Sequence, residues 1–406
     1  MRKLILALLP LLIGCTNAQN KGNDSANAAD GQLVTFHLNA PPSKVEPLLL
    51  SELADSVSYV ALETTKETLT KDGIQYGDRY YCCFESNILC FDKTGKFLHQ
   101  VGQVGRGPQE YFMSNNYLKT FRVDVTNNWV YCYSTDHRTL VYDENGKYVK
   151  TLTGEFYNYP CRLVYNHLIY FGAEAAMLNP ISIIDERTNK KVNIDRFSKE
   201  FVKEWNKKLM DEAQGYIKLN KGIFILKAMQ PVSYQTKDTY YEWSVLEHDT
   251  VYKAHDGVVS PLCLLCPINK FEFKSMFLND GEAVNLKNQP LILGMQVFKE
   301  KLLLYVQYYP SEDHNYWVVC NLKDGNVTYH TNYIINDLDG GPNIWASNDI
   351  YSLSVEDLKN DKDIYNSYFT EGVKAKLKDQ EGKFQRLLEP LVDDANPIIR
   401  TFHWKE

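Results

Sequence analysis

A glycine-rich segment at residues 102–111 (GQVGRGPQEY) carries the first side chains that could do chemistry. Glycines let a backbone approach a phosphate, but this segment lacks the Lys-Ser/Thr pair of a P-loop, and Pro108 has no N–H to donate. The segment therefore favours a tight connection between sheets, with glycines at positive φ and with Arg106 and Glu110 bonded to neighbouring loops. The alternative is that Arg106 faces a central opening as an anion or sugar contact. Arg106 and Glu110 are the first candidate ligand-binding residues.

A second segment, residues 336–342 (NDLDGGP), offers oxygen atoms at alternating positions, as calcium-binding loops do. Its carboxylates are Asp337 and Asp339. An EF-hand loop counted from Asp337 would need a carboxylate at its twelfth position, where Asn348 stands. The pattern therefore favours an Asp/Gly turn at a strand end over calcium binding. Asp337 and Asp339 complete the candidate ligand-binding residues, and we predict neither a metal site nor a cofactor.

The sequence contains no recognisable catalytic motif. None of the nine histidines falls in an HxH or HExxH pattern, and there is no Gly-x-Ser-x-Gly elbow. Aspartate and glutamate are abundant, so a hydrolase with paired carboxylates stays open, although nothing selects a pair. We therefore assign no catalytic residue and favour a protein that is not an enzyme.

Eight cysteines follow residue 80, and most sit in apolar, strand-like runs: Cys82, Cys83, Cys90, Cys132, Cys161, Cys263, Cys266 and Cys320. A buried cysteine behaves as a small apolar residue, so we expect core packing. The pair Cys263 and Cys266 has the spacing of half a zinc site, but no second CxxC completes a ligand set. An even number of cysteines in an exported chain could also form disulfides, and the redox state stays open.

The charge balance limits the class of partner. The chain has 406 residues, with 44 Lys and Arg against 51 Asp and Glu, which gives a formal net charge of −7. A nucleic-acid-binding protein needs a basic face to neutralise phosphates, so we expect no nucleic-acid partner. With 44% hydrophobic residues the chain can build a sizeable core.

The first 14 residues have the features of a signal peptide. A positive start precedes an apolar run at residues 4–12, and this run is shorter than the roughly 20 residues that span a bilayer. Residues 12–15 (LIGC) resemble the lipobox of bacterial lipoproteins. The resemblance implies cleavage before Cys15 and acylation of its thiol and its new amine, which would anchor the chain to a membrane. An ordinary cleaved signal peptide is the alternative.

Residues 15–31 are small and polar, which predicts a flexible lipidated tether. Thr16 is not an aspartate, so by resemblance to envelope sorting rules we expect the outer membrane of the cell envelope. The periplasmic or surface face stays undecided.

From about residue 32 onward, short strand-like runs alternate with turns. One stretch reads as an antiparallel meander of four strands, at residues 121–125, 129–133, 139–142 and 147–152. The hairpin sequence at residues 91–97 (FDKTGKF) recurs 51 positions later at residues 142–148 (YDENGKY). Repeats of about 40 to 50 residues with four strands each are typical of β-propellers.

Two stretches depart from this pattern of short strands and turns. Apolar residues recur at helical spacing in residues 196–214 and again in residues 361–388. We predict two helical insertions there, with their apolar stripes packed on the body of a single domain that covers residues 32–406.

Residues 91–111 resemble the six-bladed β-propeller lipoproteins of the Bacteroidetes, whose hairpin with an Asp-x-x-Gly-Lys turn precedes a Gly-x-Gly-Pro-x-Glu-Tyr loop. Further matching segments lie before it, at residues 62–64, and after it in order, at residues 249–253, 336–342 and 393–399. The resemblance implies an all-β fold: a six-bladed β-propeller of four-stranded antiparallel blades, with inserted helices. One departure is Asn336, where the family pattern leads us to expect a carboxylate.

This fold makes one topological prediction. The strand near residues 57–62 and the strand near residues 398–404 should share a blade, because pairing the two chain ends closes the ring and hides its last edges.

The expected function is binding. We expect a lipid-anchored envelope protein that catalyses no reaction and serves as a binding or scaffold protein for a glycan, a peptide or an envelope partner. The alternative is a hydrolase or lyase that acts on a glycan or a lactone, with its site at the central mouth of the propeller.

Overall fold

The structure is a computed structural model that describes residues 33–38, 43–70, 74–84, 86–112, 121–125, 127–136, 138–152, 162–164, 167–170, 181–185, 190–194, 203, 232–235, 239–243, 250–255, 258–267, 290–308, 315–339, 341–344, 352–360 and 384–405. The predicted signal peptide (residues 1–14) and tether (residues 15–31) lie outside the described residues. So does the predicted helical insertion at residues 196–214, apart from residue 203, which is helical.

The described chain is mostly β and forms six sheets. Three of them have four strands each: β4–β7 (Ile74–Tyr76, Arg79–Phe84, Asn87–Asp92, Phe97–Val101), β8–β11 (Phe121–Asp124, Trp129–Ser134, Arg138–Asp143, Tyr148–Leu152) and β12–β15 (Arg162–Val164, His167–Tyr170, Ile181–Asp185, Lys190–Ile194). Two more are built on β16–β19 (Val232–Gln235, Thr239–Trp243, Thr250–His255, Val258–Pro267) and on β20–β23 (Pro290–Phe298, Lys301–Tyr308, Asn315–Asn321, Val327–Ile335). The closing sheet has the order β24 (Ser352–Leu353), β25 (Ile398–Trp404), β3 (Ala54–Ala61).

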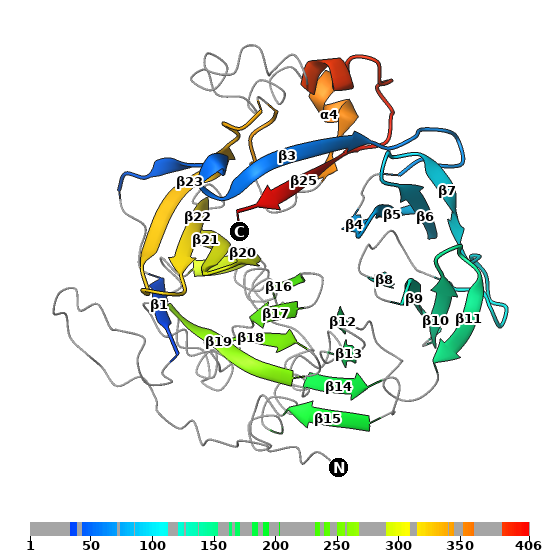
Figure 1. Ribbon diagram of the computed structural model, residues 1–406, viewed down its shortest axis with the longest axis horizontal. Coiled ribbons are helices and arrows are strands. Elements are labelled where there is room, and N and C mark those ends of the chain that lie inside the picture. The colour runs from blue at the N-terminus through cyan, green and yellow to red at the C-terminus, as the bar shows by residue number, and fades with distance from the viewer. Residues whose placement is uncertain are drawn as a thin grey trace, which may run out of the picture.

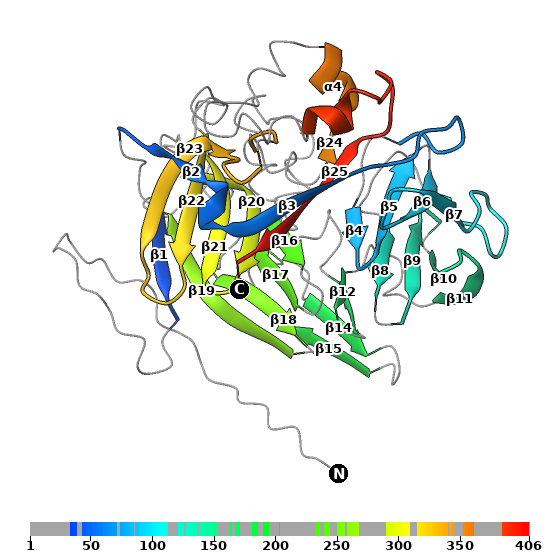
Figure 2. The ribbon, with the colours of Figure 1, turned by 45° about the horizontal axis from the view of Figure 1, so that its top comes forward.

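Figure 1 shows these sheets following one another in chain order around a central area, from β4–β7 at the upper right to β20–β23 at the left. In the sheet of β16–β19 the first strand lies towards the centre and the last lies towards the rim. The tilted view in Figure 2 keeps the same order. Successive antiparallel strands therefore step outward through a sheet before the chain passes on to the next one.

The closing sheet joins the two ends of the chain. Strand β25 pairs antiparallel with β3 over the register Ile398↔Ala61 to Trp404↔Ala54. The predicted pairing of the strands near residues 57–62 and 398–404 is confirmed. Backbone hydrogen bonds between the first and last long strands remove two open edges at once.

Two N-terminal strands depart from the prediction of purely antiparallel, four-stranded units. Strand β1 (Thr35–Leu38) pairs parallel with β19, and β2 (Glu46–Leu49) pairs parallel with β23. We call β1 and β2 the N-terminal strap. It adds a fifth strand to two sheets, and its side chains Phe36, Leu38 and Leu48 are buried. The extra strands form because the outer edges of β19 and β23 have free backbone groups and border apolar surface that the strap covers.

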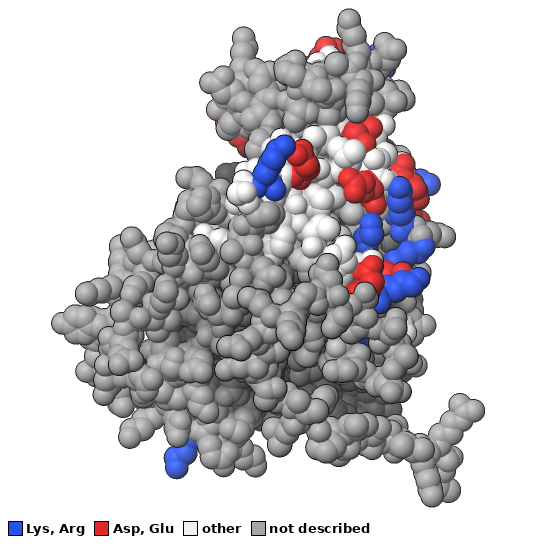
Figure 3. All heavy atoms as spheres, turned by 90° about the vertical axis from the view of Figure 1, so that its left-hand side faces the viewer, with Lys and Arg blue, Asp and Glu red and all other residues white. Residues whose placement is uncertain are grey.

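The face on the left-hand side of Figure 1 carries both positive and negative side chains among its described residues. Figure 3 shows lysine or arginine side chains next to aspartate or glutamate, beside an uncharged area. Exposed ion pairs of opposite sign include Lys44 with Glu46 and Lys323 with Glu300. Pairs this exposed contribute little to stability.

The hydrophobic core lies between neighbouring sheets. One cluster of buried residues joins the sheets β4–β7 and β8–β11 and includes Ile88, Val101, Phe121 and Leu140. A larger cluster joins the sheets of β16–β19 and β20–β23. In these two pairs, each sheet buries a face against its neighbour.

Helices cover the closing sheet. The helix α4 (Val355–Asn360) and the helical residues 384–388 pack Leu358, Phe384 and Leu388 against Ile398 of β25. The predicted insertion at residues 361–388 is thus helical at its end, whereas residues 361–383 lie outside the described residues. Helix α4 begins before the predicted range, because Val355 and Leu358 supply apolar contacts one turn apart.

Candidate functional site

The glycine-rich segment connects the sheets β4–β7 and β8–β11. It folds back on itself, because the N–H of Gly105 donates to the carbonyl oxygen of Tyr111 (2.9 Å) and the N–H of Tyr111 donates to that of Gln103 (3.0 Å). Glu110 Oε2 accepts a hydrogen bond from the N–H of Gly107 at 2.8 Å. The acid predicted to bind a ligand therefore also holds its own loop together.

Two glycines are needed here for space. A Cβ atom at Gly105 would lie 2.0 Å from Glu110 Oε2, and one at Gly107 would lie 2.9 Å from Glu110 Cδ. Positive φ occurs at Gly102 (+61°) at the start of the segment. The prediction of glycines at positive φ thus holds for Gly102, whereas Gly105 and Gly107 make room for the Glu110 carboxylate.

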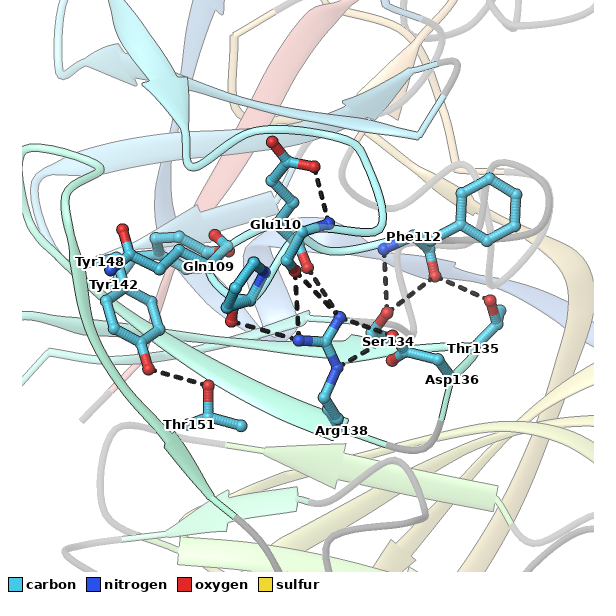
Figure 4. Close-up of polar contacts among 12 residues, drawn as sticks. Gln109, Glu110, Phe112, Ser134, Thr135, Asp136, Arg138, Tyr142, Tyr148 and Thr151 are labelled. Atoms are coloured by element: carbon cyan, nitrogen blue, oxygen red, sulfur yellow. Dashed lines mark hydrogen bonds and ion pairs between the residues drawn. The ribbon is translucent and has the colours of Figure 1, made fainter.

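Arg138 in β10 supports the loop from below (Figure 4). Its Nη1 donates to the carbonyl oxygen of Gly107 at 3.2 Å, and its Nη2 donates to that of Glu110 at 3.2 Å. Its Nε donates to Asp136 Oδ2 at 2.9 Å, and this hydrogen bond lowers the pKa of the Asp136 carboxyl group. The arginine charge is therefore balanced by Asp136, and Figure 4 shows the Glu110 carboxylate on the other side of the loop.

Two tyrosines fix the remaining parts of the loop. The hydroxyl of Tyr142 donates to the carbonyl oxygen of Gln109 at 2.9 Å. Tyr111 is fully buried, and its hydroxyl donates to the carbonyl oxygen of Val101 (2.9 Å) and accepts from the N–H of Ile88 (3.1 Å). Burial raises the pKa of Tyr111 above its usual range, so the hydroxyl stays neutral.

Sequence reasoning did not find Arg138 or Tyr142. Arg138 has no motif around it, and Tyr142 was noted only as the start of the repeated hairpin, so only the fold shows that both lie under the loop. Arg106 was predicted, and the structure places it on the exposed side of the loop with its guanidinium carbon 5.1 Å from the ring centre of Phe112.

A pocket of about 480 Å³ opens beside this loop. Its lining combines one carboxylate, two primary amides, two tyrosines and small or cyclic residues: Gly102, Gln103, Pro108, Gln109, Glu110, Tyr142, Gly146 and Tyr148. Tyr142 is buried, whereas Tyr148 and Glu110 are partly exposed. We call this space the junction pocket, and it is the candidate functional site.

The predicted acidic pair lies elsewhere, between the sheet of β20–β23 and the closing sheet. Asp337 accepts hydrogen bonds from the backbone N–H (2.9 Å) and the hydroxyl (2.6 Å) of Ser51. Asp339 Oδ1 accepts from the N–H of Gly341 at 3.0 Å. The structure therefore does not bring Asp337 and Asp339 together with Arg106 and Glu110.

A buried polar cluster surrounds Asp339. Asn336 is fully buried, and its Nδ2 donates to Asp339 Oδ1 (2.8 Å) and to the hydroxyl of Tyr59 (3.0 Å). Arg400 is also buried and donates from Nη1 to the carbonyl oxygen of Pro342 at 2.8 Å. Burial, and next the charge of Asp339, raises the pKa of Tyr59 above its usual range. These contacts join the closing sheet to its neighbour.

The described residues contain no group of three or more His, Cys, Asp or Glu side chains placed to hold a metal ion. Seven cysteines in the described part of the chain are buried and form no disulfide there: Cys82, Cys83, Cys90, Cys132, Cys263, Cys266 and Cys320. Core packing is confirmed for these seven, including the Cys263 and Cys266 pair, while Cys15 and Cys161 lie outside the described residues. Burial raises the pKa of Cys263 to about 12.

No helix within the described ranges is long and apolar enough to cross a membrane.

Comparisons with known proteins give one family and several similar folds. Residues 33–403 match the family described as "Domain of unknown function (DUF4934)". A search of curated proteins found no significant match. The crystal structure of a "putative exported protein" from Bacteroides fragilis is similar with a TM-score of 0.59 at 16% sequence identity, covering 92% of this chain and 100% of that one. That likeness shows a shared fold.

Two further structures are similar at lower TM-scores. A member of the DUF4221 family from Bacteroides vulgatus has a TM-score of 0.40 at 12% identity, covering 87% of this chain and 98% of that one. BamB from Moraxella catarrhalis has a TM-score of 0.33 at 9% identity, covering 68% of this chain and 66% of that one.

Proposed function

The chain belongs to the DUF4934 family, and we propose that it is a lipid-anchored, six-bladed β-propeller of the bacterial cell envelope that binds a partner without catalysing a reaction. The partner is a glycan, a peptide or another envelope protein. The membrane is contacted through the lipid at the N-terminus, and the outer membrane is the proposed location.

The arrangement of the sheets supports the six-bladed ring. The described chain forms six sheets in chain order around a central area, and β25 pairs with β3 where the order returns to its start. A closed ring buries both faces of every sheet, and the N-terminal strap covers two of the outer edges.

The observation that carries the binding role is the rigidity of the junction pocket. Arg138 and Tyr142 hold the backbone carbonyl groups of Gly107, Gln109 and Glu110 from below. A pocket whose walls are held by hydrogen bonds loses little conformational entropy when a ligand binds. Its polar lining offers both donors and acceptors, which suits recognition of a polar ligand.

The four predicted ligand-binding residues divide between two roles. Glu110 lines the junction pocket, and the exposed Arg106 lies on the outer side of the same loop. Asp337 and Asp339 accept hydrogen bonds at a joint between sheets, and we assign them to holding that joint.

The lipid anchor is supported by the apolar run at residues 4–12 and by the residues LIGC that end at Cys15. Mass spectrometry of the N-terminal peptide from the membrane fraction should find acyl chains on Cys15. The Cys15→Ser chain should leave that fraction, because its new N-terminus has no lipid. A mature N-terminus at another residue without acyl chains would rule the anchor out.

Binding is tested with the otherwise complete Cys15→Ser chain. Envelope glycans, peptides and purified envelope proteins are added in thermal-shift measurements, and sugar release is followed in parallel. A rise in the melting temperature without turnover supports the proposal, since a ligand that binds the folded state stabilises it. Turnover of a glycan or lactone would instead support a hydrolase or lyase.

A further inference from the structure

Two junctions between neighbouring sheets are built from repeated hairpins. In the β6–β7 hairpin the N–H of Gly95 donates to the carbonyl oxygen of Asp92 at 2.9 Å, and in the β10–β11 hairpin the N–H of Gly146 donates to that of Asp143 at 3.0 Å. Both glycines have positive φ, +86° and +76°. The two hairpins are therefore copies of one local structure, 51 residues apart in the sequence.

Each hairpin also makes the same contact with the preceding sheet. The N–H of Glu63, after β3, donates to the carbonyl oxygen of Gly95 at 2.8 Å, and the N–H of Gly102, after β7, donates to that of Gly146 at 2.9 Å. Glu63 and Gly102 thus occupy matching places. A pocket of about 470 Å³ lies at the first junction and one of about 480 Å³ at the second.

The two junctions differ in one hydrogen bond. At the first, Glu63 Oε2 accepts from the N–H of Phe97, the first residue of β7, at 2.9 Å. The matching residue of β11 is Tyr148. Gly102, which stands in place of Glu63, has no side chain that could accept from the N–H of Tyr148.

The geometry of both hairpins turns this N–H outward. Phe97 pairs with Phe91, and Tyr148 pairs with Tyr142, each just beyond the hairpin's closing backbone hydrogen bonds. The next pair in an antiparallel ladder is not hydrogen-bonded, so its N–H groups point away from the partner strand. The N–H of Tyr148 therefore points away from β10, and Tyr148 lines the junction pocket.

Glu110 supplies the opposite group. Its Oε2 accepts from Gly107, which leaves Oε1 able to accept from a ligand. Asp136 already balances the charge of Arg138, and no basic residue is among the described residues that line the pocket, so Glu110 gives this part of the lining a net negative charge. A ligand carboxylate placed at the Tyr148 N–H, as Glu63 is at Phe97, would be repelled by Glu110.

The ligand group must therefore accept from Tyr148, donate to Glu110 and carry no negative charge. Hydroxyl groups do both, and adjacent hydroxyls on one ring do so at once. The partly exposed ring of Tyr148, which lines the pocket, offers an apolar surface. We propose that the junction pocket binds a neutral glycan through the N–H of Tyr148 and the carboxylate of Glu110, an inference that rests on the proposed binding function.

The test uses the Cys15→Ser chain and named sugars. Maltohexaose, mannohexaose and xylohexaose are the neutral probes, tetragalacturonic acid is the acidic probe, and a lysine-free alanine–serine hexapeptide is the peptide probe. Calorimetry gives the affinities, and amide hydrogen exchange compares Tyr148 with Phe97. The repeat supplies matched control variants: Glu110→Gln against Glu63→Gln, and Tyr148→Ala against Phe97→Ala.

We expect at least one neutral hexasaccharide to bind and to slow exchange at Tyr148 but not at Phe97. Glu110→Gln should weaken this binding by about tenfold, because a charged acceptor is replaced by a neutral one. Glu63→Gln should change it by less than about twofold, because Glu63 lies at the other junction. Thermal unfolding shows whether each variant is folded. Hydrogen exchange at Tyr148 and Phe97, measured in the chain without these substitutions, gives a second readout that needs no variant at either junction.

Two results would overturn the glycan assignment. One is that no neutral sugar binds, and the other is that binding is unchanged in both Glu110→Gln and Tyr148→Ala. If the hexapeptide or an envelope protein binds while the sugars do not, the glycan assignment fails and the binding function stands. If a sugar binds and is cleaved, the non-catalytic function fails while the site assignment stands.

Discussion

Tyr59 of β3 and Arg400 of β25 face each other across the antiparallel pair that joins the two ends of the chain. Tyr59 accepts a hydrogen bond from Asn336, and Arg400 donates one to the carbonyl oxygen of Pro342, so both side chains hold the same loop of the neighbouring sheet. Closure of the ring and attachment of the preceding sheet therefore depend on one buried polar cluster.

This cluster explains why an amide stands at position 336, where the family resemblance led us to expect a carboxylate. We predict that Asn336→Asp destabilises the fold by about 3 kcal/mol near neutral pH, because it loses two donors and places a second carboxylate beside Asp339. Burial and the charge of Asp339 would raise the pKa of the new carboxyl group in the folded state. The loss of stability should therefore be small in acid. It should grow as the pH rises above about 4, the pKa of the carboxyl group in the unfolded chain.

Urea unfolding at acidic and neutral pH measures this effect. The matched control is Asn145→Asp, an exposed site in the β10–β11 hairpin, where we expect a change within about 0.5 kcal/mol. A loss at position 336 that does not depend on pH would contradict the role given to the Asp339 carboxylate.

Comparing substitutions at three hairpin glycines with similar φ angles separates the cost of backbone strain from the cost of steric contact. We predict that Gly325→Ala costs about 1 kcal/mol, since its φ is +75° and the nearest atom to an added Cβ is 3.6 Å away. Gly95→Ala and Gly146→Ala should cost clearly more, because their Cβ atoms would lie 2.2 Å and 2.5 Å from backbone oxygens of the preceding sheet. Chemical denaturation ranks the three variants, and equal losses would mean that the sheets are not in this contact.

The N-terminal strap should be part of the folded core. We predict that Leu38→Ala in β1 costs about 2–5 kcal/mol, because Leu38 is 1% exposed and packs in the largest core cluster. The same substitution at Leu98, which is 43% exposed on the open edge strand β7, should cost less than about 1 kcal/mol. Denaturant midpoints of the two variants give the comparison, and equal values would place the strap outside the core.

Buried thiols should resist alkylation. In a chain carrying Cys15→Ser and Cys161→Ser, we predict slow labelling of the remaining seven cysteines by iodoacetamide until the protein is unfolded. Burial raises the pKa of Cys263 to about 12, so its labelling should not speed up near pH 9 as that of an exposed cysteine does. Because the unfolded thiol ionises at about pH 8.5, stability should fall as the pH rises above that value.

Mass spectrometry of the labelled peptides identifies each cysteine. Rapid labelling of Cys263 in the folded chain would show that the β18–β19 region opens. A mass lower by two hydrogens in a linked peptide pair would show a disulfide instead.

Local structure could be predicted from the sequence with good accuracy. The hairpin at residues 142–148 was found because Asp143 accepts from backbone N–H groups two and four residues ahead and Gly146 takes the positive φ that the turn needs. Every contact in that turn joins residues that are close in the sequence, so the turn can be recognised from a short run of consecutive residues. The pairing of β3 with β25 was also predicted, because a ring of repeated units has to close where the chain ends meet.

The site was only half predictable. The glycine-rich loop stood out in the sequence, and Glu110 lines the pocket beside it. Arg138, Tyr142 and Tyr148 could not be found, because each lies in an ordinary strand and gains its role from a backbone group that is distant in the sequence. Asp337 and Asp339 looked like ligands by type and spacing, whereas the fold places Ser51 and Asn336 against them.

The sequence by itself determined the strand pattern, the turns and the repeat, since each depends on residue types within a short window or at a fixed period. Only the tertiary structure decided which carboxylates are already hydrogen-bonded, where the strap runs, and which side chains line the junction pocket. Those outcomes depend on groups that packing between sheets brings together. A local sequence pattern does not show which residues of a distant strand will lie beside a given side chain.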